Sequence, residues 1–440
     1  MKFNERAFIE ERDRQIKLTF LKEVANYDKQ VAPIMRAKGY CRIDATERTV
    51  LFTFGEITYL RNRWRRKKET CYPVDEWLGL KKYMRYSPEL IFHMVKHASK
   101  LPYREVCRIM QDAYPIDVSK DAVLKAVKLA GKLFSEKESY RFYLEEEVSE
   151  KIKAPKIYVE GDGVWIKTRS KKNSQCYTDL THFLVHTGSL KDNHSRPTLA
   201  NKHEIIHTNH EKAKEELLDY LYNHFEITDQ TILITNSDGG IGYGRRTFQE
   251  IQKALGIKRH EHFWDESHLH KEINTFFAPY SKPLRDLAYK AIETHQRSLL
   301  VVVLDTVESL IEREDEKEKC EHFRQKILRN FKDTKPAKLR GLSHQCIGVM
   351  ESQHRKITYR MKRRGMYWSL EGVCAMAKTI LLERIDQLED LFFGNWRQQY
   401  ALYQGNSFSA GYSNRRVEES PPIRTYKSGH KTGRWRSRTK

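Results

Sequence analysis

Three features that mark common classes of protein are missing from this sequence. No apolar run reaches 18 residues, and the longest, near Ser298–Leu304, is far too short to span a bilayer. The charged N-terminus has no apolar segment of the kind that directs secretion. The seven cysteines are odd in number and include no CxxC pair, which argues against a disulfide framework or a cysteine-based zinc site. These absences predict a cytoplasmic protein without a membrane partner.

Negative charge is also scarce relative to positive charge. The chain has 80 Lys and Arg against 59 Asp and Glu, which gives a formal net charge of +21 and a pI of about 9.5. A surplus of this size attracts polyanions, of which nucleic acid is the most common for a large chain. A basic surface that serves only solubility is the simpler alternative. With 440 residues, of which 39% are hydrophobic, the chain is expected to form two to four domains at roughly 150 residues each.

The N-terminal region, residues 1–85, is predicted to contain a helix and a β-hairpin. Residues 1–40 have apolar positions in a charged background and favour a helix, whereas residues 49–60 favour two short strands that turn at Gly55. The segment 61–68 follows with six cations in eight residues. A solvated arm is one interpretation, and a phosphate-binding edge is the preferred one. The residues expected to contact DNA here are Arg61, Arg63, Trp64, Arg65 and Arg66.

Residues 86–150 are predicted to be helical. Ser87 and Pro88 are suited to begin a first short helix, residues 103–110 have helical apolar spacing, and Ser119 is a good N-cap for a third. Three short helices of this size are typical of a helix-turn-helix DNA-binding region, although a plain helical bundle gives the same pattern.

From residue 151 the pattern changes to α/β. Strands are predicted at 156–166, 180–186, 203–208 and 231–235, and helices at 210–225 and 246–255. Strands followed by alternating strands and helices predict a mixed sheet covered by helices over 151–282. Residues 283–340 are expected to form a helical insertion and 341–400 further helices. Residues 401–440 are expected to form a flexible basic tail that contacts DNA.

Two aspartates follow the apolar runs of predicted strands. Asp162 lies in YVEGDGVW and Asp238 in ITNSDGG, and both are expected at strand ends. Each is followed by glycine, so either pair taken alone is most simply a turn. Taken together in a basic protein, two neighbouring carboxylates favour a site for a divalent cation, because the cation would offset their repulsion. Oxygen ligands indicate Mg²⁺ or Mn²⁺ rather than zinc.

A third acid is a candidate to complete such a site. Glu351 begins the segment ESQHRKITYRMKRRG, in which Arg355 follows at i+4 on the same helical face. Spacing alone favours an ordinary surface ion pair between these two side chains. A catalytic interpretation pairs an acid for a metal ion with cations for a scissile phosphate. The cations expected to contact DNA in this segment are Arg355, Lys362, Arg363 and Arg364.

Three patches of sequence together resemble a known family. GDGVWIK around Asp162, ITNSDGG around Asp238 and MESQHRKITYRMKRRGMYWS around Glu351, with FGEITYLRNRWRRKK and EWLGL nearer the N-terminus, are similar to the ISLre family of bacterial insertion-sequence transposases. The similarity covers about residues 1–400. More distantly, the patches resemble the Mutator-like group of DDE transposases.

The resemblance implies a ribonuclease-H-like catalytic fold with a DDE triad of Asp162, Asp238 and Glu351, and a helical insertion between the last two. The interval from Asp238 to Glu351 spans 113 positions, which is long enough to hold one. The Mutator-like (C/D)-x-x-H motif is matched by Asp265 and His268, which are expected to play a supporting role. Two further acids compete for places in the triad, namely Glu371 with Glu351 and Glu160 with Asp162.

A separate metal site is conceivable in the histidine-rich stretch 260–270, which contains His260, His262, His268 and His270 beside Asp265. Structural zinc sites usually include cysteine, which this stretch lacks. Zinc is therefore the weaker interpretation.

The sequence thus predicts an insertion-sequence transposase that binds terminal inverted repeats and target DNA as a dimer or larger assembly. Two Mg²⁺ or Mn²⁺ ions would support strand cleavage and strand transfer. Two alternatives stay open: a ribonuclease-H-like nuclease without strand transfer, and a DNA-binding regulator without catalytic activity.

Overall fold

The computed structural model describes residues 3–114, 116–144, 150–169, 175–190, 198–240, 242–342, 346–362 and 364–405. The chain divides into two compact units. The first comprises Met1–Tyr140 and Glu371–Leu402, and the second comprises Arg141–Leu370 and Tyr403–Lys440. Residues 371–400 therefore belong with the N-terminal region, whereas the sequence had placed them with the catalytic core. The predicted tail from residue 406 and Arg363 lie outside the described residues.

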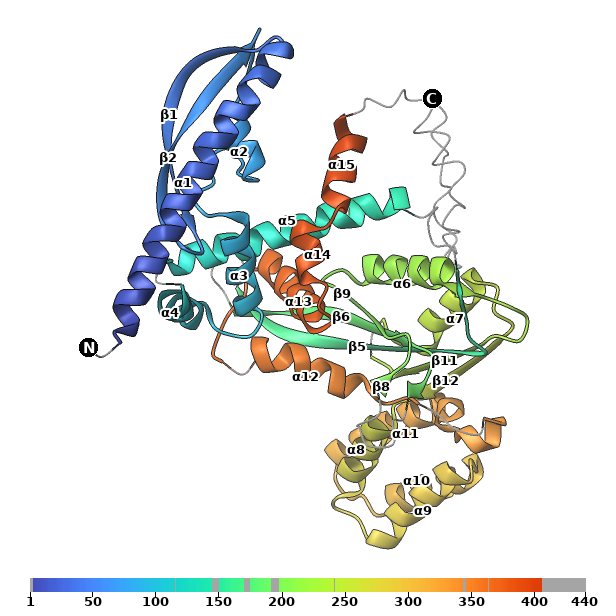
Figure 1. Cartoon of the computed structure of the whole chain (residues 1–440). Helices are drawn as coiled ribbons and strands as arrows, with labels where there is room; N and C mark the ends of the chain where they lie inside the picture. The colour runs from blue at the N-terminus through green and yellow to red at the C-terminus, as the bar shows by residue number, and fades with distance from the viewer. Residues whose placement is uncertain are drawn as a thin grey trace. The chain divides into compact units, whose positions relative to one another are not determined.

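The first unit begins with a long helix packed on a β-hairpin. Helix α1 (Glu5–Ala37) lies along strands β1 (Cys41–Phe52) and β2 (Gly55–Arg66) (Figure 1). Both strands have 12 residues, so the hairpin is much longer than predicted. Gly55 follows the turn with φ +117°, a conformation that favours glycine. The short β3 (Glu69–Cys71) and α2 (Pro73–Trp77) complete this part.

The predicted helical region is confirmed as α3 (Pro88–Ala98), α4 (Tyr103–Ala113) and α5 (Lys120–Leu144), of which the third is far longer than expected. Ser87 and Ser119 act as the expected N-caps, since their hydroxyls accept hydrogen bonds from the N–H groups of Leu90 and Ala122. The C-terminal helices of the same unit are α13 (Leu370–Arg384), α14 (Leu388–Phe393) and α15 (Trp396–Gly405). They pack on these helices through contacts such as Phe92 with Phe392.

The second unit is built on a five-stranded mixed sheet, which confirms the predicted class. Its strands are β5 (Lys156–Arg169), β6 (Gln175–His186), β9 (His203–His207), β11 (Ile232–Ser237) and β12 (Arg259–Trp264). They are ordered β12-β11-β5-β6-β9. The first three are parallel, and β6 pairs antiparallel with both β5 and β9. Four two-residue strands form two small ladders: β4 (Ile152–Lys153), β7 (Ser189–Leu190), β8 (Thr198–Leu199) and β10 (Phe225–Glu226).

Alternating residues of β5 point to two different layers of helix. Ile157 and Val159 pack with α6 (His210–His224) and α7 (Arg245–Ala254) in one buried cluster. Tyr158 lies on the other face, in a cluster with Ile234. Because Glu160 and Asp162 share the parity of Tyr158, they face this second side, where α12 (Met350–Met361) contacts β5.

Helices are present in the predicted range 283–340, and the helical segment begins earlier than expected, at Glu266. Helix α8 (Glu266–Phe277) shares one hydrophobic core with the helices that follow it. These are α9 (Lys282–Glu293), α10 (Arg297–Ser309), α11 (Glu314–Arg329), η1 (Phe331–Thr334) and η2 (Ala337–Arg340). The group lies in the chain between β12 and α12. Among the described residues, no helix combines the length and apolarity needed to cross a bilayer.

Candidate active site

Asp162 lies in the middle of β5, which corrects the prediction that it ends a strand. The strand continues to Arg169 because it stays paired with β6 through Arg169 and Gln175. The pairing of β5 with β11, however, stops at Glu160 and Asn236. Asp162 therefore stands just beyond the point where β5 loses its neighbour on one side, which leaves room for other groups beside it.

The same register brings Asp238 level with Asp162. Asp238 follows β11 directly and lies two residues beyond Asn236, just as Asp162 lies two residues beyond Glu160. The two carboxylates interact, since burial, followed by the negative charge of Asp238, raises the pKa of Asp162 from 3.8 to about 7. One oxygen of Asp238 accepts a hydrogen bond from the N–H of Gly240 at 2.8 Å. The predicted pair of aspartates is thus brought together.

The glycines on either side of Asp162 make room for groups on the opposite face of the sheet. A Cβ at Gly161 would stand 2.8 Å from a ring carbon of Phe183, and a Cβ at Gly163 would stand 2.4 Å from Oδ1 of Asp179. Taken alone, the Asp162–Gly163 pair indicated a turn, but both residues lie inside β5. In the structure, both glycines let neighbouring side chains pack tightly over the strand.

Asp179, on β6, is an acid that the sequence analysis missed. Its pKa is raised by burial and by the negative charge of Asp238, against the lowering effects of His210 and Lys362. Within the described residues, its Oδ1 atom is buried and has no hydrogen-bond partner. The sequence alone could not identify Asp179 as a site residue, because its place in the site depends on how β6 pairs with β5.

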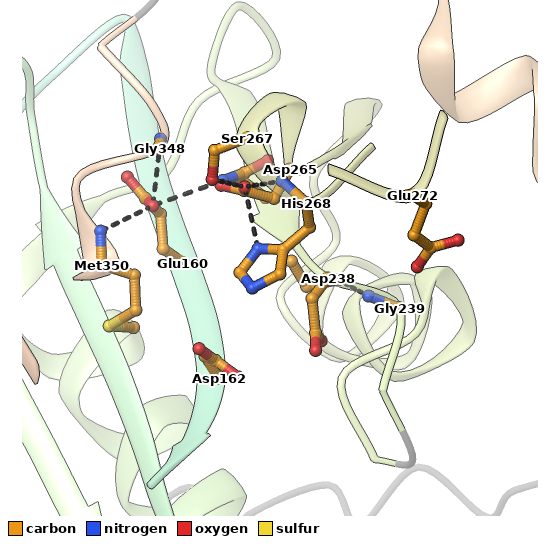
Figure 2. Close-up of polar contacts among 12 residues, drawn as sticks. Glu160, Asp162, Asp238, Gly239, Asp265, Ser267, His268, Glu272, Gly348 and Met350 are labelled. Carbon is orange, nitrogen blue, oxygen red and sulfur yellow. Dashed lines mark hydrogen bonds and ion pairs between the residues drawn. The ribbon is translucent and has the colours of Figure 1, made fainter. Parts of the chain in front are cut away.

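Asp265 and His268 contact each other as the (C/D)-x-x-H spacing suggested. Asp265 caps the N-terminus of α8, and its Oδ1 lies 3.0 Å from both the N–H and the Nδ1 of His268. The hydrogen bond to Asp265 raises the pKa of His268, and the charges of Asp238 and Asp162 act in the same direction. Figure 2 shows the imidazole reaching into the space between these two aspartates.

The candidate third acid stands apart from the aspartate pair. Glu351 is exposed in the first turn of α12. Across the described ranges, no three His, Cys, Asp or Glu side chains are grouped closely enough to hold a metal ion, so Glu351 does not join the two aspartates in a ready-made site. Its rival Glu371 is also exposed and belongs to the other unit.

His354 is the side chain of α12 that reaches Asp162. Its Nδ1 atom lies 3.5 Å from Oδ2 of Asp162, and its ring stacks on His182 with centroids 5.2 Å apart. Burial is the main cause that lowers the pKa of His354 to about 3, so the ring is neutral. The residue lies within the ESQHRK patch. Only the position of α12 against β5 reveals which of its side chains meets the aspartate.

The histidine-rich stretch is largely an edge strand rather than a metal cluster. His260 and His262 lie on β12, and each approaches Oγ1 of Thr235 at 2.8 Å. Burial lowers the pKa of His260 to about 4 and that of His262 to about 3. Both rings are therefore neutral hydrogen-bonding groups between two strands. His268 and His270 belong instead to the following helix, α8.

Part of the predicted DNA-binding run on β2 is structural. Trp64 is fully buried against Val31 and Met35, so the expectation that it contacts DNA is corrected. Arg61 is mostly buried, pairs with Asp75, and lies 3.9 Å from the ring of Tyr72.

The other cations of the run are more accessible. Arg63 pairs with Asp44, and Arg65 and Arg66 are exposed. Arg355 is exposed on α12, Lys362 is exposed directly after the helix, and Arg364 is partly exposed.

The fold and the site define a mixed α/β protein in which two interacting carboxylates lie beside an aspartate–histidine pair. The chain belongs to UPF0236, described as an uncharacterised protein family, whose profile matches residues 6–390. A UPF0236 protein in the vanSb 3′ region of Streptococcus gallolyticus is 28% identical over 377 residues, which cover 85% of this chain and 80% of the relative. A UPF0236 protein of Caldanaerobacter subterraneus subsp. tengcongensis is 24% identical over 334 residues, or 74% of this chain and 65% of the relative. The match spans just under two thirds of that second protein.

A solved structure also aligns with the chain. It is the Drosophila P element transposase strand transfer complex, which aligns over 79% of this chain and 95% of its own at 9% identity and a TM-score of 0.23. A TM-score of that size does not establish a shared fold.

Proposed function

We propose that this protein is an insertion-sequence transposase of the ISLre type, which cuts and joins DNA by a DDE mechanism with Asp162, Asp238 and Glu351. The observation that carries the proposal is the register of β5 and β11, which brings Asp162 and Asp238 to the same level in a basic protein. The pKa of Asp162, raised to about 7, is typical of a carboxylate in a functional site.

The topology supports a ribonuclease-H-like core. The resemblance implies such a core with a helical insertion between the second aspartate and the glutamate. The sheet has three parallel strands and two antiparallel ones, with Asp162 on its central strand and Asp238 after the next. The helices from α8 to η2 lie between Asp238 and Glu351, where the insertion is expected.

The carboxylate pair fits Mg²⁺ or Mn²⁺. Its ligands are oxygens, which these ions prefer. Burial and then the charge of Asp238 raise the pKa of Asp162, and a cation would offset the repulsion between the two carboxylates. Asp162 and Asp238 would hold the ions, and Glu351 would complete the site from α12. Bound there, the ions would supply Lewis-acid stabilisation of the attacking and leaving oxygens in phosphoryl transfer.

The chain's own residues would orient the DNA around these ligands. Asp265 fixes the ring of His268 beside both aspartates, where an imidazolium can donate to a phosphate oxygen. Arg355 on α12 and Lys362 directly after it would contact the DNA backbone near the cleaved bond. Water would cut the transposon end, and the 3′-hydroxyl so formed would attack target DNA in line, without a covalent protein–DNA intermediate.

The partner would be double-stranded DNA, comprising terminal inverted repeats and target. The accessible cations of β2 and helices α3 to α5 would bind the repeats, and the residues of the 401–440 segment would bind flanking DNA. Binding through phosphates weakens steeply with salt. Because two transposon ends are processed together, a dimer or larger assembly on DNA in the cytoplasm is part of the proposal.

The names of the relatives add independent support. The name of another relative from Caldanaerobacter subterraneus subsp. tengcongensis joins eleven locus designations, as for a protein encoded at several places in one genome. Multiplication within a genome is what a mobile element produces.

A strand-transfer assay tests the proposal. A pre-cut repeat end, taken from the DNA that flanks the gene, is incubated with a target plasmid, the protein and Mg²⁺. The wild type is expected to give joined product, and Asp162→Asn and Asp238→Asn none. Cleavage without joining would identify a nuclease, and an unchanged DNA phenotype in both variants and in Glu351→Gln would indicate a regulator.

A further inference from the structure

Glu160 is a buried carboxylate directly beside the candidate site. Its side chain is fully buried, and its Oε2 atom accepts hydrogen bonds from three consecutive backbone N–H groups. The donors are Gly348 at 3.1 Å, Val349 at 3.1 Å and Met350 at 3.3 Å. Figure 2 shows the contacts of Glu160 with Gly348 and Met350. These residues immediately precede or begin α12, so Glu160 caps that helix from a strand 188 or more positions earlier in the chain.

The backbone before α12 is shaped to receive this carboxylate. Gly348 has φ +79°, and Val349 follows in the right-handed helical region. Successive residues of opposite hand turn their N–H groups toward one point and form a concavity that binds anions. The positive end of the helix dipole favours the same charge. A carboxylate is costly to bury, and these donors offset that cost.

Asn236 extends the contact to the other side of the site. Its Nδ2 lies 3.4 Å from Oε2 of Glu160 and 3.1 Å from Oδ2 of Asp265. Asp265 in turn holds the ring of His268. One buried network therefore connects strand β5, strand β11, the start of α8 and the start of α12, which carry or adjoin Asp162, Asp238, His268 and Glu351.

We propose that Glu160 is a positioning residue, which fixes the start of α12 and thereby sets His354 against Asp162 and places Glu351 in the first turn of the helix. The expected effect on DNA cleavage rests on the proposed function, whereas the expected effect on the start of α12 does not. Glu160 is not suited to replace Asp162 in the triad, because its carboxylate is fully buried and already accepts hydrogen bonds from the backbone at the start of α12.

Two variants test the proposal by different routes. Glu160→Gln keeps the size of the side chain and removes its charge. Gly348→Ala leaves Glu160 unchanged and strains the concavity. The added Cβ would not clash, because its nearest neighbour, Oδ2 of Asp265, would stand 3.7 Å away. The strain would come instead from the positive φ of residue 348, which alanine disfavours. Each is expected to lower DNA cleavage by about 10- to 100-fold, the range for residues that orient metal ligands, with DNA affinity unchanged. Hydrogen exchange should become faster at the amides of residues 348–354.

A matched control separates positioning from general loss of stability. Asp333 is another buried acid of the same unit, paired with Arg245. Asp333→Asn is expected to lower stability without changing cleavage per folded molecule or exchange at 348–354. Wild-type cleavage and exchange in Glu160→Gln would overturn the proposal. If that variant does not fold, the same result in Gly348→Ala would overturn it. Absence of cleavage by the wild type would count against the proposed function alone, since the exchange measurement does not depend on activity.

Discussion

Asp179 lies directly over Gly163, so closely that a Cβ at residue 163 would stand 2.4 Å from its carboxylate oxygen. Gly163→Ala is therefore expected to displace Asp179 or bend β5, and to destabilise the protein by about 1–3 kcal/mol, as overpacking usually does. Urea unfolding measures the change. Gly244→Ala is the matched control, because its added Cβ would meet no atom within 4 Å. Equal midpoints for wild type and Gly163→Ala would contradict the packing described for β5.

The raised pKa of Asp162 predicts a pH dependence of stability. The folded protein binds the Asp162 proton more tightly than the unfolded chain does, because the pKa rises from 3.8 to about 7 on folding. The resulting stabilisation is complete below about pH 4 and is lost as the pH rises through 7. Without divalent ions, we expect this residue to lower stability between pH 5 and pH 8 by on the order of a few kcal/mol.

Thermal unfolding with EDTA, at pH 5 and pH 8, measures this effect. Asp162→Asn should remove the corresponding part of the pH dependence and be more stable than wild type at pH 8. Addition of Mg²⁺ or Mn²⁺ at pH 8 should raise the melting temperature of the wild type and leave that of the variant nearly unchanged. The same pH dependence in both proteins would show that Asp162 is not the responsible group.

The sequence predicted those site residues that lie in a recognisable local pattern of neighbouring residues. Asp162 and Asp238 each follow an apolar run, and such runs predicted strands that the structure confirms. The position of Asp162 within its strand was wrong, because the length of β5 depends on pairing with β6, which no local pattern encodes. Asp179 and His354 could not be predicted for a similar reason. Each belongs to the site only because the fold brings it beside a residue far away in the chain, Gly163 for Asp179 and Asp162 for His354.

The N-terminal hairpin illustrates a second limit of sequence patterns. Cations surround Trp64 in the sequence and suggested an exposed edge. The pairing of β1 with β2 shifts between Arg42 and Asp44, which are the partners of Trp64 and Arg63. A bulge of this kind re-aims side chains, and here the indole points into the core beneath α1.

This arrangement predicts opposite effects for neighbouring residues of β2. Trp64→Ala should destabilise the first unit by about 3–5 kcal/mol through the cavity it leaves. Replacement of both Arg65 and Arg66 by Ala should leave stability within about 0.5 kcal/mol. If both side chains contact phosphates, it should also weaken DNA binding and reduce the salt slope by about 1 per contact. Fluorescence anisotropy with labelled repeat DNA at several salt concentrations measures both quantities. A normal salt slope in the double variant would exclude this edge from the DNA interface.

The third acid can be assigned by comparing three residues. Glu351 is exposed, so Glu351→Gln should change the free energy of unfolding by no more than about 0.5 kcal/mol. If it holds a metal ion, the same variant should abolish cleavage while DNA binding persists. Glu371→Gln, exposed in the other unit, should cleave at the wild-type rate. His354→Gln should lower both stability and cleavage, because the ring is buried beside Asp162.

Single-turnover cleavage of repeat DNA, with unfolding measured in parallel, separates these cases. Loss of cleavage in Glu371→Gln with normal activity in Glu351→Gln would move the third acid to Glu371. Normal activity in both glutamate variants, with loss only in His354→Gln, would make His354 the contribution of α12, because its Nδ1 atom already lies 3.5 Å from Oδ2 of Asp162. A nitrogen ligand would then favour Mn²⁺ over Mg²⁺, since imidazole suits transition metals better than it suits magnesium.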